Sequence, residues 1–203
     1  ISGGLVGSEM CIRDSQLTEK ELQAINEKTQ LRTTFKVACD TYHGDNTKAL
    51  EYLKNRGFTE DICNTFEIGF SGNNLPGSSE NIKADLHIKK EDGTTYNFYW
   101  DNRVIFPIHD KNGNPIAFTG RSTLSHDELK LKKIPKYKNT KESPIFKKNE
   151  ILYGYHLAKK HIARSSTARL VEGPTDAVSY THLRAHETSL NLLLRIQLVI
   201  VLG

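Results

Sequence analysis

The segment between residues 86 and 121 places the strongest constraint on the fold, because it holds two pairs of strand-like runs joined by turn sequences. The runs are Leu86–Lys90 and Thr95–Trp100 around Asp92 and Gly93, then Arg103–His109 and Pro115–Arg121 around Asp110–Asn114. Apolar and polar residues that alternate with a period of two predict strands, and Asp-Gly or Asn-Gly between two such runs predicts a hairpin. We therefore expect an antiparallel sheet of about four strands, with Pro107 at an edge or a bulge.

The residues before this segment follow a helical period instead. We expect a helix over Gln16–Thr29 with a capping box of Thr18 and Glu21, whose packing face would be Leu17, Leu22 and Ile25. Further helices are expected from Thr33 or Thr34 (packing through Phe35, Val37, Ala38 and Tyr42), from a cap at Asn46 to Gly57, and from a cap at Thr59. Ser71–Glu80 is rich in turn residues and reads as a subdomain linker. Helices followed by an antiparallel sheet indicate an α+β fold.

Ala168–Val178 has the pattern of a strand, a turn and a helix. Arg169, Leu170 and Val171 read as the end of a short buried strand, Gly173 and Pro174 as the turn, and Thr175 as the cap of the helix. The carboxylates Glu172 and Asp176 flank this turn, and two carboxylates this close favour a hard cation such as Mg²⁺. The alternative is an ordinary strand–turn–helix whose Glu172 merely faces water.

Leu129–Lys148 is strongly basic. It contains eight lysines against the single acid Glu142, namely Lys130, Lys132, Lys133, Lys136, Lys138, Lys141, Lys147 and Lys148. Tyr137 and Phe146 interleave with them, which suits single-stranded nucleic acid or nucleotides because phosphates need cations and bases need stacking partners. The alternative is a solvated charged loop. Pro135 and Pro144 keep the stretch from forming a regular helix, and a helix over Glu150–Ala163 should follow.

Arg103 and Arg121 stand at strand ends, where an arginine can hold a phosphate through two hydrogen bonds. The alternative is an edge arginine paired with Asp101 or Asp110. His87 and His109 read as structural or solvent-facing residues, Trp100 as a core residue, and Cys39 and Cys63 as small core residues. The sequence shows neither a Ser/His/Asp or Cys/His arrangement nor a phosphate-binding glycine loop of Walker type.

Composition limits the class of protein. The 203 residues carry a net charge of +4 and 37% hydrophobic residues, which fits a soluble globular chain of one or two domains. Cys11, Cys39 and Cys63 lack zinc-module spacing, which argues against such a module in this chain and fits a reducing, cytoplasmic compartment. The apolar stretch 190–202 is too short and too polar to span a bilayer, so we expect no membrane association.

The two ends contain strings that resemble translated sequencing adapters. Residues 7–15 and 179–188 match such strings and bracket the coherent part of the chain. We therefore expect residues 1–15 and 179–203 to be non-native and exclude them from the candidate site.

An ordered set of blocks resembles the catalytic core of bacterial and phage DnaG-type DNA primases. The blocks are residues 56–62, 66–70, 102–121, 136–139, 142–148, 152–154 and 171–176. Any one block is weakly specific, but the set in this order covers nearly all of residues 16–178. The resemblance implies a basic subdomain over 16–167, whose helical part and antiparallel sheet precede the first strand of an α/β Toprim domain at 168–178.

The resemblance also implies site residues. Glu172 would be the Toprim glutamate, a general base or metal-side carboxylate, and Asp176 the acidic residue of the same motif. Template, nucleotide or nascent RNA would be held by Arg103, Arg121, Lys136, Tyr137, Asn139 and Lys148. Mg²⁺ or Mn²⁺ would assist attack of a 3′-hydroxyl on an α-phosphate. The Asp-x-Asp that completes a Toprim metal site and the amino-terminal zinc module are missing, and Pro174-Thr175 replaces the common Tyr-Met.

The expected function is therefore that of a DNA primase, a DNA-directed RNA polymerase that makes short RNA primers on single-stranded DNA. Its expected partners are template DNA, nucleoside triphosphates, nascent RNA and, for the complete protein, a replicative helicase. Because the carboxylate set is incomplete, we expect this chain to be inactive alone. The rival functions are a non-catalytic single-strand-binding module and another Toprim enzyme, a nuclease or topoisomerase relative.

Overall fold

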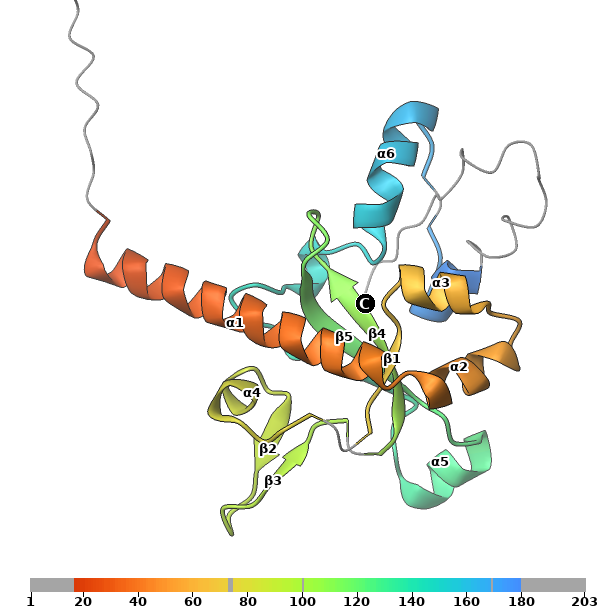
Figure 1. Ribbon diagram of the computed structural model, residues 1–203, viewed down its shortest axis with the longest axis horizontal. Helices are drawn as coiled ribbons and strands as arrows, with labels where there is room; N and C mark the ends of the chain where they lie inside the picture. The colour runs from red at the N-terminus through yellow and green to blue at the C-terminus, as the bar shows by residue number, and fades with distance from the viewer. Residues whose placement is uncertain (1–16, 73–74, 100, 169, 180–203) are drawn as a thin grey trace, which may run out of the picture.

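A computed structural model describes residues 17–72, 75–99, 101–168 and 170–179. The helices are α1 (Glu19–Gly44), α2 (Thr47–Lys54), α3 (Glu60–Thr65), α4 (Ser79–Lys83), α5 (His126–Lys132) and α6 (Tyr155–Ser165), with a 3₁₀ turn η1 (Lys148–Glu150). The strands are β1 (Gly69–Phe70), β2 (His87–Lys89), β3 (Thr95–Asn97), β4 (Arg103–His109), β5 (Pro115–Ser122) and β6 (Tyr137–Asn139). The α+β prediction is confirmed (Figure 1). None of these helices combines the length and the apolar composition that a membrane span requires.

The main sheet has four strands in the order β1-β4-β5-β6, all antiparallel to their neighbours. Both predicted hairpins form. The prediction that they join into one sheet is wrong, because β2 and β3 make a separate two-stranded sheet. The edge of β4 is taken by β1 instead. This is possible because Gly69 has no side chain, and a Cβ there would overlap the backbone of Tyr42 in α1. Pro107 lies beyond the end of β1, next to a register shift at Ile108 and His109.

Helix α1 is one helix and not the predicted two. Thr29, Thr33 and Thr34 donate hydrogen bonds to carbonyls four residues earlier, so they continue the helix where we expected a break. The capping box of Thr18 and Glu21 is confirmed. The predicted packing of Leu17, Leu22, Ile25 and Val37 is wrong: all four are exposed, and residues 17–30 have no buried member because this half of α1 extends beyond the sheet (Figure 1).

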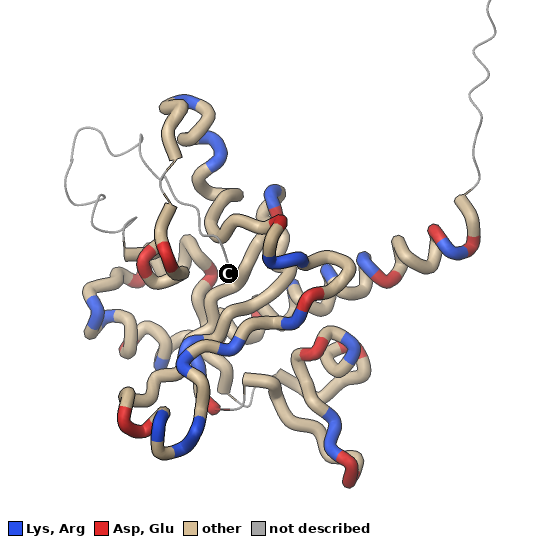
Figure 2. The backbone as a smooth tube through the Cα atoms, turned by 180° about the vertical axis from the view of Figure 1, so that it is seen from behind, with Lys and Arg blue, Asp and Glu red and all other residues tan. Residues whose placement is uncertain are grey.

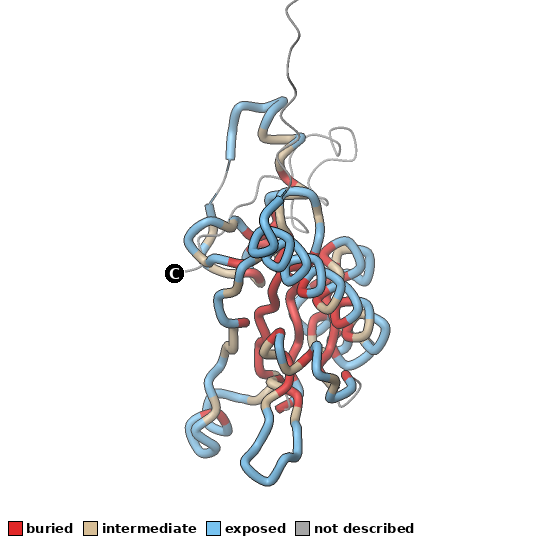
Figure 3. Tube along the Cα trace, turned by 90° about the vertical axis from the view of Figure 1, so that its left-hand side faces the viewer, coloured by how far each residue is buried: buried red, intermediate tan, exposed pale blue. Residues whose placement is uncertain are grey.

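The sheet is covered on both faces, and its central strands are buried throughout (Figure 3). One face packs on the second half of α1 through Phe35, Tyr42 and Phe118. The other face packs on α2, α3 and the segment around Tyr153, with Val104 and Phe106 at its centre. Cys39, Cys63, His87 and His109 are buried, as predicted for structural residues. Trp100 lies outside the described residues.

The predicted caps have mixed outcomes. Thr59 caps α3, and Gly57 has the positive φ of 83° that its role as a helix terminator requires. Asn46 makes no capping hydrogen bond with its side chain. Helix α6 begins at Tyr155 and not at Glu150, because η1 and then Gly154, with φ 74°, occupy the intervening residues.

The last described segment corrects the predicted strand–turn–helix. Leu170 forms only an isolated bridge and is largely exposed, so a buried strand end is wrong there, and Arg169 lies outside the described residues. Residues 174–179 are helical. The Ala177 N–H donates to the Gly173 carbonyl, so Gly173 caps the helix, Pro174 takes its first position and Thr175 lies inside it. The expected non-native ends, 1–15 and 179–203, lie outside the described residues except for Ser179.

Candidate nucleic-acid interface

A hollow of about 390 Å³ forms where β5 ends and β6 begins. It is lined by Arg56, Phe58, Arg121, Lys136, Tyr137, Thr175, Asp176 and Ser179. These residues come from the turn after α2, from the central sheet and from the short helix at 174–179. The fold therefore gathers four of the predicted site residues, Arg121, Lys136, Tyr137 and Asp176, around one cavity.

Arg121 is held in place before any ligand binds. The residue is only 8% exposed, and its Nη1 lies 3.0 Å from the Tyr137 hydroxyl and 3.3 Å from the Thr175 hydroxyl. Strand register places Tyr137 directly opposite, with its ring centroid 5.6 Å from the guanidinium carbon. The Arg121 Nε is buried without a partner among the described residues. A buried, unpaired donor on a fixed cation suits a phosphate oxygen.

The surrounding side chains combine positive charge with aromatic rings. Lys136 is exposed, and its Nζ lies 5.8 Å from the centroid of the Tyr137 ring. Arg56 is exposed too, and its guanidinium carbon lies 4.7 Å from the centroid of the Tyr52 ring. Alternating cations and ring faces can hold a phosphate backbone while bases stack, without selecting a sequence.

Arg103 does not belong to this surface, which corrects its predicted role as a phosphate ligand. The side chain is fully buried. Its Nε and Nη2 donate to the two carboxylate oxygens of Asp101 at 2.8 and 2.5 Å. The remaining donors reach the carbonyls of Gly120, Lys136 and Pro135. All five N–H groups are thus engaged inside the fold, and the alternative of pairing with Asp101 holds.

Asn139 and Lys148 lie away from the hollow. Asn139, at the end of β6, is half-buried, and its Oδ1 accepts a hydrogen bond from the Thr119 hydroxyl. Lys148 begins η1, and its backbone N–H donates to Glu142 at 3.0 Å.

The lysine-rich stretch is structured in short pieces and is not one loop. It runs through α5, β6 and η1, which confirms that no regular helix spans it. Figure 2 shows its basic residues following one another along the backbone from α5 past β6. Lys138 is tied inward, at 3.2 Å from Asp101 and 3.1 Å from the Phe98 carbonyl. Lys136 is the lysine of this stretch that reaches the hollow.

The two carboxylates flank a tight turn. Glu172 and Asp176 are both exposed, and Asp176 lines the hollow while Glu172 does not. The Asp176 carboxylate folds back over the turn, since a Cβ on Gly173 would lie 3.2 Å from its Oδ2. Carboxylate oxygens are the donors that Mg²⁺ prefers, so both residues have suitable ligand atoms, although only Asp176 lines the hollow.

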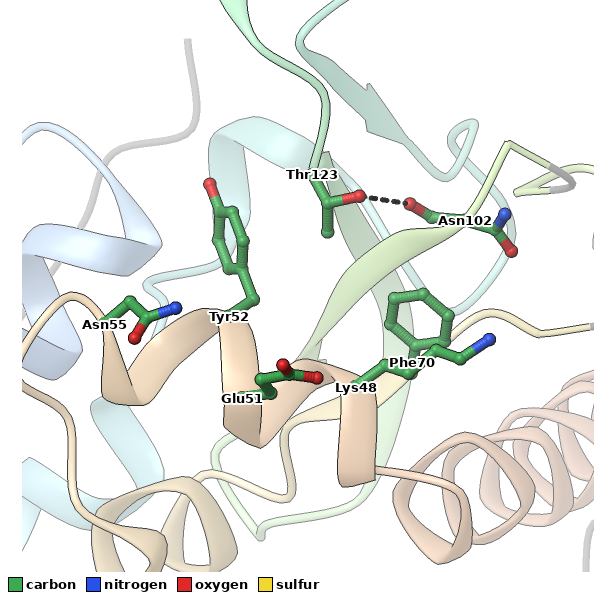
Figure 4. A pocket seen from close by; sticks show the side chains of 7 residues that line it. All are labelled: Lys48, Glu51, Tyr52, Asn55, Phe70, Asn102 and Thr123. Atoms are coloured by element: carbon green, nitrogen blue, oxygen red, sulfur yellow. Dashed lines mark hydrogen bonds between the residues drawn. The ribbon is translucent and has the colours of Figure 1, made fainter.

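A second hollow, of about 370 Å³, lies beside the first and was missed by the sequence reasoning (Figure 4). It is lined by Lys48, Glu51, Tyr52, Asn55, Phe70, Asn102 and Thr123. In Figure 4, Tyr52 and Thr123 point into the same space. The contact of Arg56 with Tyr52 links the two hollows. The sequence signal for it was the spacing of Lys48 and Tyr52, because residues four apart in a helix lie on the same face.

Comparisons with known proteins agree with this architecture. The family model for the N-terminal domain of the DNA primase catalytic core matches residues 34–159. A DNA primase of Geobacillus stearothermophilus is 34% identical over 178 residues, which cover 82% of this chain but 28% of the relative. The E. coli primase catalytic core superimposes with a TM-score of 0.69 at 28% identity, covering 85% of this chain and 55% of that one. A DnaG primase catalytic domain bound to single-stranded DNA shares the fold, with a TM-score of 0.68 at 24% identity and coverage of 88% and 57%.

The matched residues include the main sheet, the helices that cover it and most of the residues that line the hollow around Arg121. The family match spans more than half of the chain, from the second half of α1 into α6. The chain therefore belongs to the family of the DNA primase catalytic core, N-terminal domain.

Proposed function

We propose that this chain is a segment of a cytoplasmic DNA primase that synthesises short RNA primers on single-stranded DNA. The observation that carries the proposal is the hollow that Arg121, Lys136, Tyr137 and Asp176 line together. The relatives named DNA primase support it. Because the chain covers only 28% of the length of those relatives, the activity of the whole protein is part of the proposal.

In this proposal the hollow holds the phosphates of template DNA, nucleoside triphosphate or nascent RNA. Arg121 supplies a fixed guanidinium, and Arg56 and Lys136 supply exposed cations beside it. The Tyr137 ring offers a face on which a base can stack. Asn139 and Lys148 extend the surface along β6 and η1. Positioning of this kind lowers the barrier to phosphoryl transfer, because the reacting groups meet already oriented.

Glu172 and Asp176 would hold Mg²⁺ or Mn²⁺. When bound, the ion stabilises charge on the phosphate oxygens during attack of a 3′-hydroxyl. We propose that residues 16–167 form the basic subdomain and that residues 168–178 begin a Toprim domain. Waters and substrate phosphates would complete the coordination of Mg²⁺. By the resemblance, an Asp-x-Asp motif adds further carboxylates, and we propose that without it this segment alone does not polymerise. A replicative helicase and an upstream zinc module belong to the complete protein.

Binding of single-stranded DNA tests the interface. Fluorescence anisotropy with a labelled oligonucleotide, repeated over a range of salt concentrations, should show affinity that falls steeply with salt. Lys136→Met should weaken binding and reduce the salt slope by about 0.7 for each phosphate that the protein no longer neutralises. Lys160→Met is the matched control, since Lys160 is an exposed lysine of α6 away from the hollow. Equal effects of both variants would refute the assignment.

Primer synthesis tests the chemistry. In a longer primase chain that contains this segment, Glu172→Gln should abolish synthesis on a single-stranded template with Mg²⁺ while DNA binding is retained. Unchanged synthesis would overturn the role of Glu172. DNA binding without synthesis in the unmutated longer chain would instead favour a non-catalytic single-strand-binding module. Strand cleavage or relaxation would favour another Toprim enzyme.

A further inference from the structure

Three side chains with metal-binding atoms meet in the interior, away from the basic hollow. They are Cys39, Glu67 and His109, and one potential ligand atom from each lies within 4.8 Å of the other two. Cys39 and His109 are buried, while the Glu67 side chain is 34% exposed. A thiol, an imidazole and a carboxylate in one cluster form a donor set typical of zinc.

The cluster joins three separate parts of the fold. Cys39 lies in the buried half of α1, His109 ends β4, and Glu67 lies in the turn between α3 and β1. Glu67 has a φ of 51°, in the left-handed region that non-glycine residues seldom adopt. Such conformations persist where the surroundings hold them and gather at functional sites. The turn is therefore fixed in the geometry that brings the Glu67 carboxylate to His109.

The distances suit a tetrahedral ion after a small adjustment. The Glu67 Oε2 now lies 2.6 Å from the His109 Nε2, whereas two ligand atoms on one zinc ion lie roughly 3.3 Å apart at bond lengths near 2.0 Å. The other Glu67 oxygen lies 3.7 Å from the Lys36 Nζ, which leaves Oε2 directed at the cluster. The ion therefore needs the distance between the Glu67 Oε2 and the His109 Nε2 to increase by about 0.7 Å, the difference between these two values.

A fourth ligand and an entry path are also at hand. The ring of His156, in α6, lies 4.3 Å from that of His109, and its Nδ1 is buried without a partner among the described residues. His109 also lines a separate surface hollow of about 420 Å³, through which an ion can reach the cluster. A zinc site needs four ligands and access from solvent.

We propose that Cys39, Glu67 and His109 bind a zinc-class divalent transition metal, with His156 or water as the fourth ligand. The ion would fasten α1, the turn at Glu67 and the end of β4 to one another. Its role is structural and independent of the primase function proposed above. The thiol loses its proton to solvent on binding, and the ion takes the place of that proton.

Cobalt titration of the full chain, stripped of metal with a chelator, tests the proposal. One Co²⁺ per chain should bind and produce thiolate-to-cobalt charge-transfer absorption, which Zn²⁺ then removes by displacement. Cys39→Ser should abolish that absorption and weaken binding roughly tenfold or more. Cys63→Ser is the matched control, because it removes a buried thiol outside the cluster and should leave the absorption intact.

Thermal stability is a second readout, and it tests the proposal even if the Cys39 variant does not fold. Zn²⁺ should raise the Tm of the unmodified chain, since an ion that binds only the folded state stabilises it. Glu67→Gln alters a partly exposed side chain and should fold, yet lose most of that rise. The proposal is overturned if Co²⁺ produces no charge-transfer absorption, if Cys39→Ser keeps it, if Cys63→Ser loses it, or if Glu67→Gln retains the full rise in Tm.

Discussion

Replacing Arg103 by Met should destabilise the fold and not merely weaken DNA binding. The change removes five hydrogen bonds at once and leaves Asp101, whose side chain is 3% exposed, as a buried carboxylate. Breaking a buried ion pair by removing one partner costs about 3–5 kcal/mol. Three carbonyls also lose their donor, which adds to the cost. Lys138, at 3.2 Å from Asp101, compensates only in part. We therefore expect a loss of about 4 kcal/mol.

Urea unfolding followed by circular dichroism measures this loss. With a typical slope near 2 kcal/mol per molar urea, the midpoint should fall by about 2 M. Arg103→Lys should recover only a part of it, because an ammonium group cannot reproduce the planar fork that meets Asp101 and three carbonyls. The double variant Asp101→Asn with Arg103→Met should cost less than the sum of the single changes, since it leaves no buried charge unpaired.

Arg121→Met is the matched control for Arg103→Met, because it makes the same residue change in the strand that pairs with β4. Arg121 donates to two hydroxyls, and within the described part of the chain its Nε has no partner, so its loss should cost about 1 kcal/mol and reduce DNA affinity strongly. The two arginines should thus give opposite patterns. A stable Arg103→Met protein with reduced DNA affinity would refute the assignment of Arg103 to the interior.

Two further predictions concern acid stability and close packing. Burial is the largest single effect on Asp101 and would raise its pKa, but the hydrogen bonds and positive charges of Arg103 and Lys138 together outweigh it, so the pKa is lowered. A carboxyl whose pKa is lower in the folded state stabilises the fold above its unfolded pKa of about 3.9 and loses that contribution as the pH falls through the folded pKa. Urea midpoints should therefore drop below about pH 4, with a shallower dependence in Asp101→Asn. Gly69→Ala should destabilise the chain by several times RT, about 2 kcal/mol or more, because its Cβ overlaps the backbone of Tyr42. Gly44→Ala should be nearly neutral, because the described structure has no neighbouring atom within 4 Å of the added carbon. Thermal melts of the two variants measure the difference.

Much of the local structure could be predicted from the sequence. The hairpin of β4 and β5, the smaller hairpin of β2 and β3, the capping box at Thr18 and the terminator Gly57 all formed as expected. Each depends on residues close together in the chain. The ordered motifs identified the family as well, since they are a property of the sequence alone.

The hydrogen-bond partners of the two arginines could not be predicted, because they come from distant parts of the chain. Arg103 and Arg121 look alike in the sequence, as arginines at strand ends. Only the fold shows that Asp101 and three carbonyls enclose one of them, while Tyr137 and Thr175 hold the other at a cavity. The exposure of Leu22 and Ile25 has the same origin, because no part of the described sheet reaches that half of α1.

The sequence by itself therefore determined the α+β class, the hairpins, several helix ends and the family, because backbone preferences and turn chemistry act over a few residues. The tertiary structure alone decided how strands joined into sheets, which arginine lines the hollow, and that Glu67 meets His109 from 42 residues away. Those outcomes depend on burial and on the satisfaction of polar groups across the whole fold, and neither can be counted within a short stretch of chain.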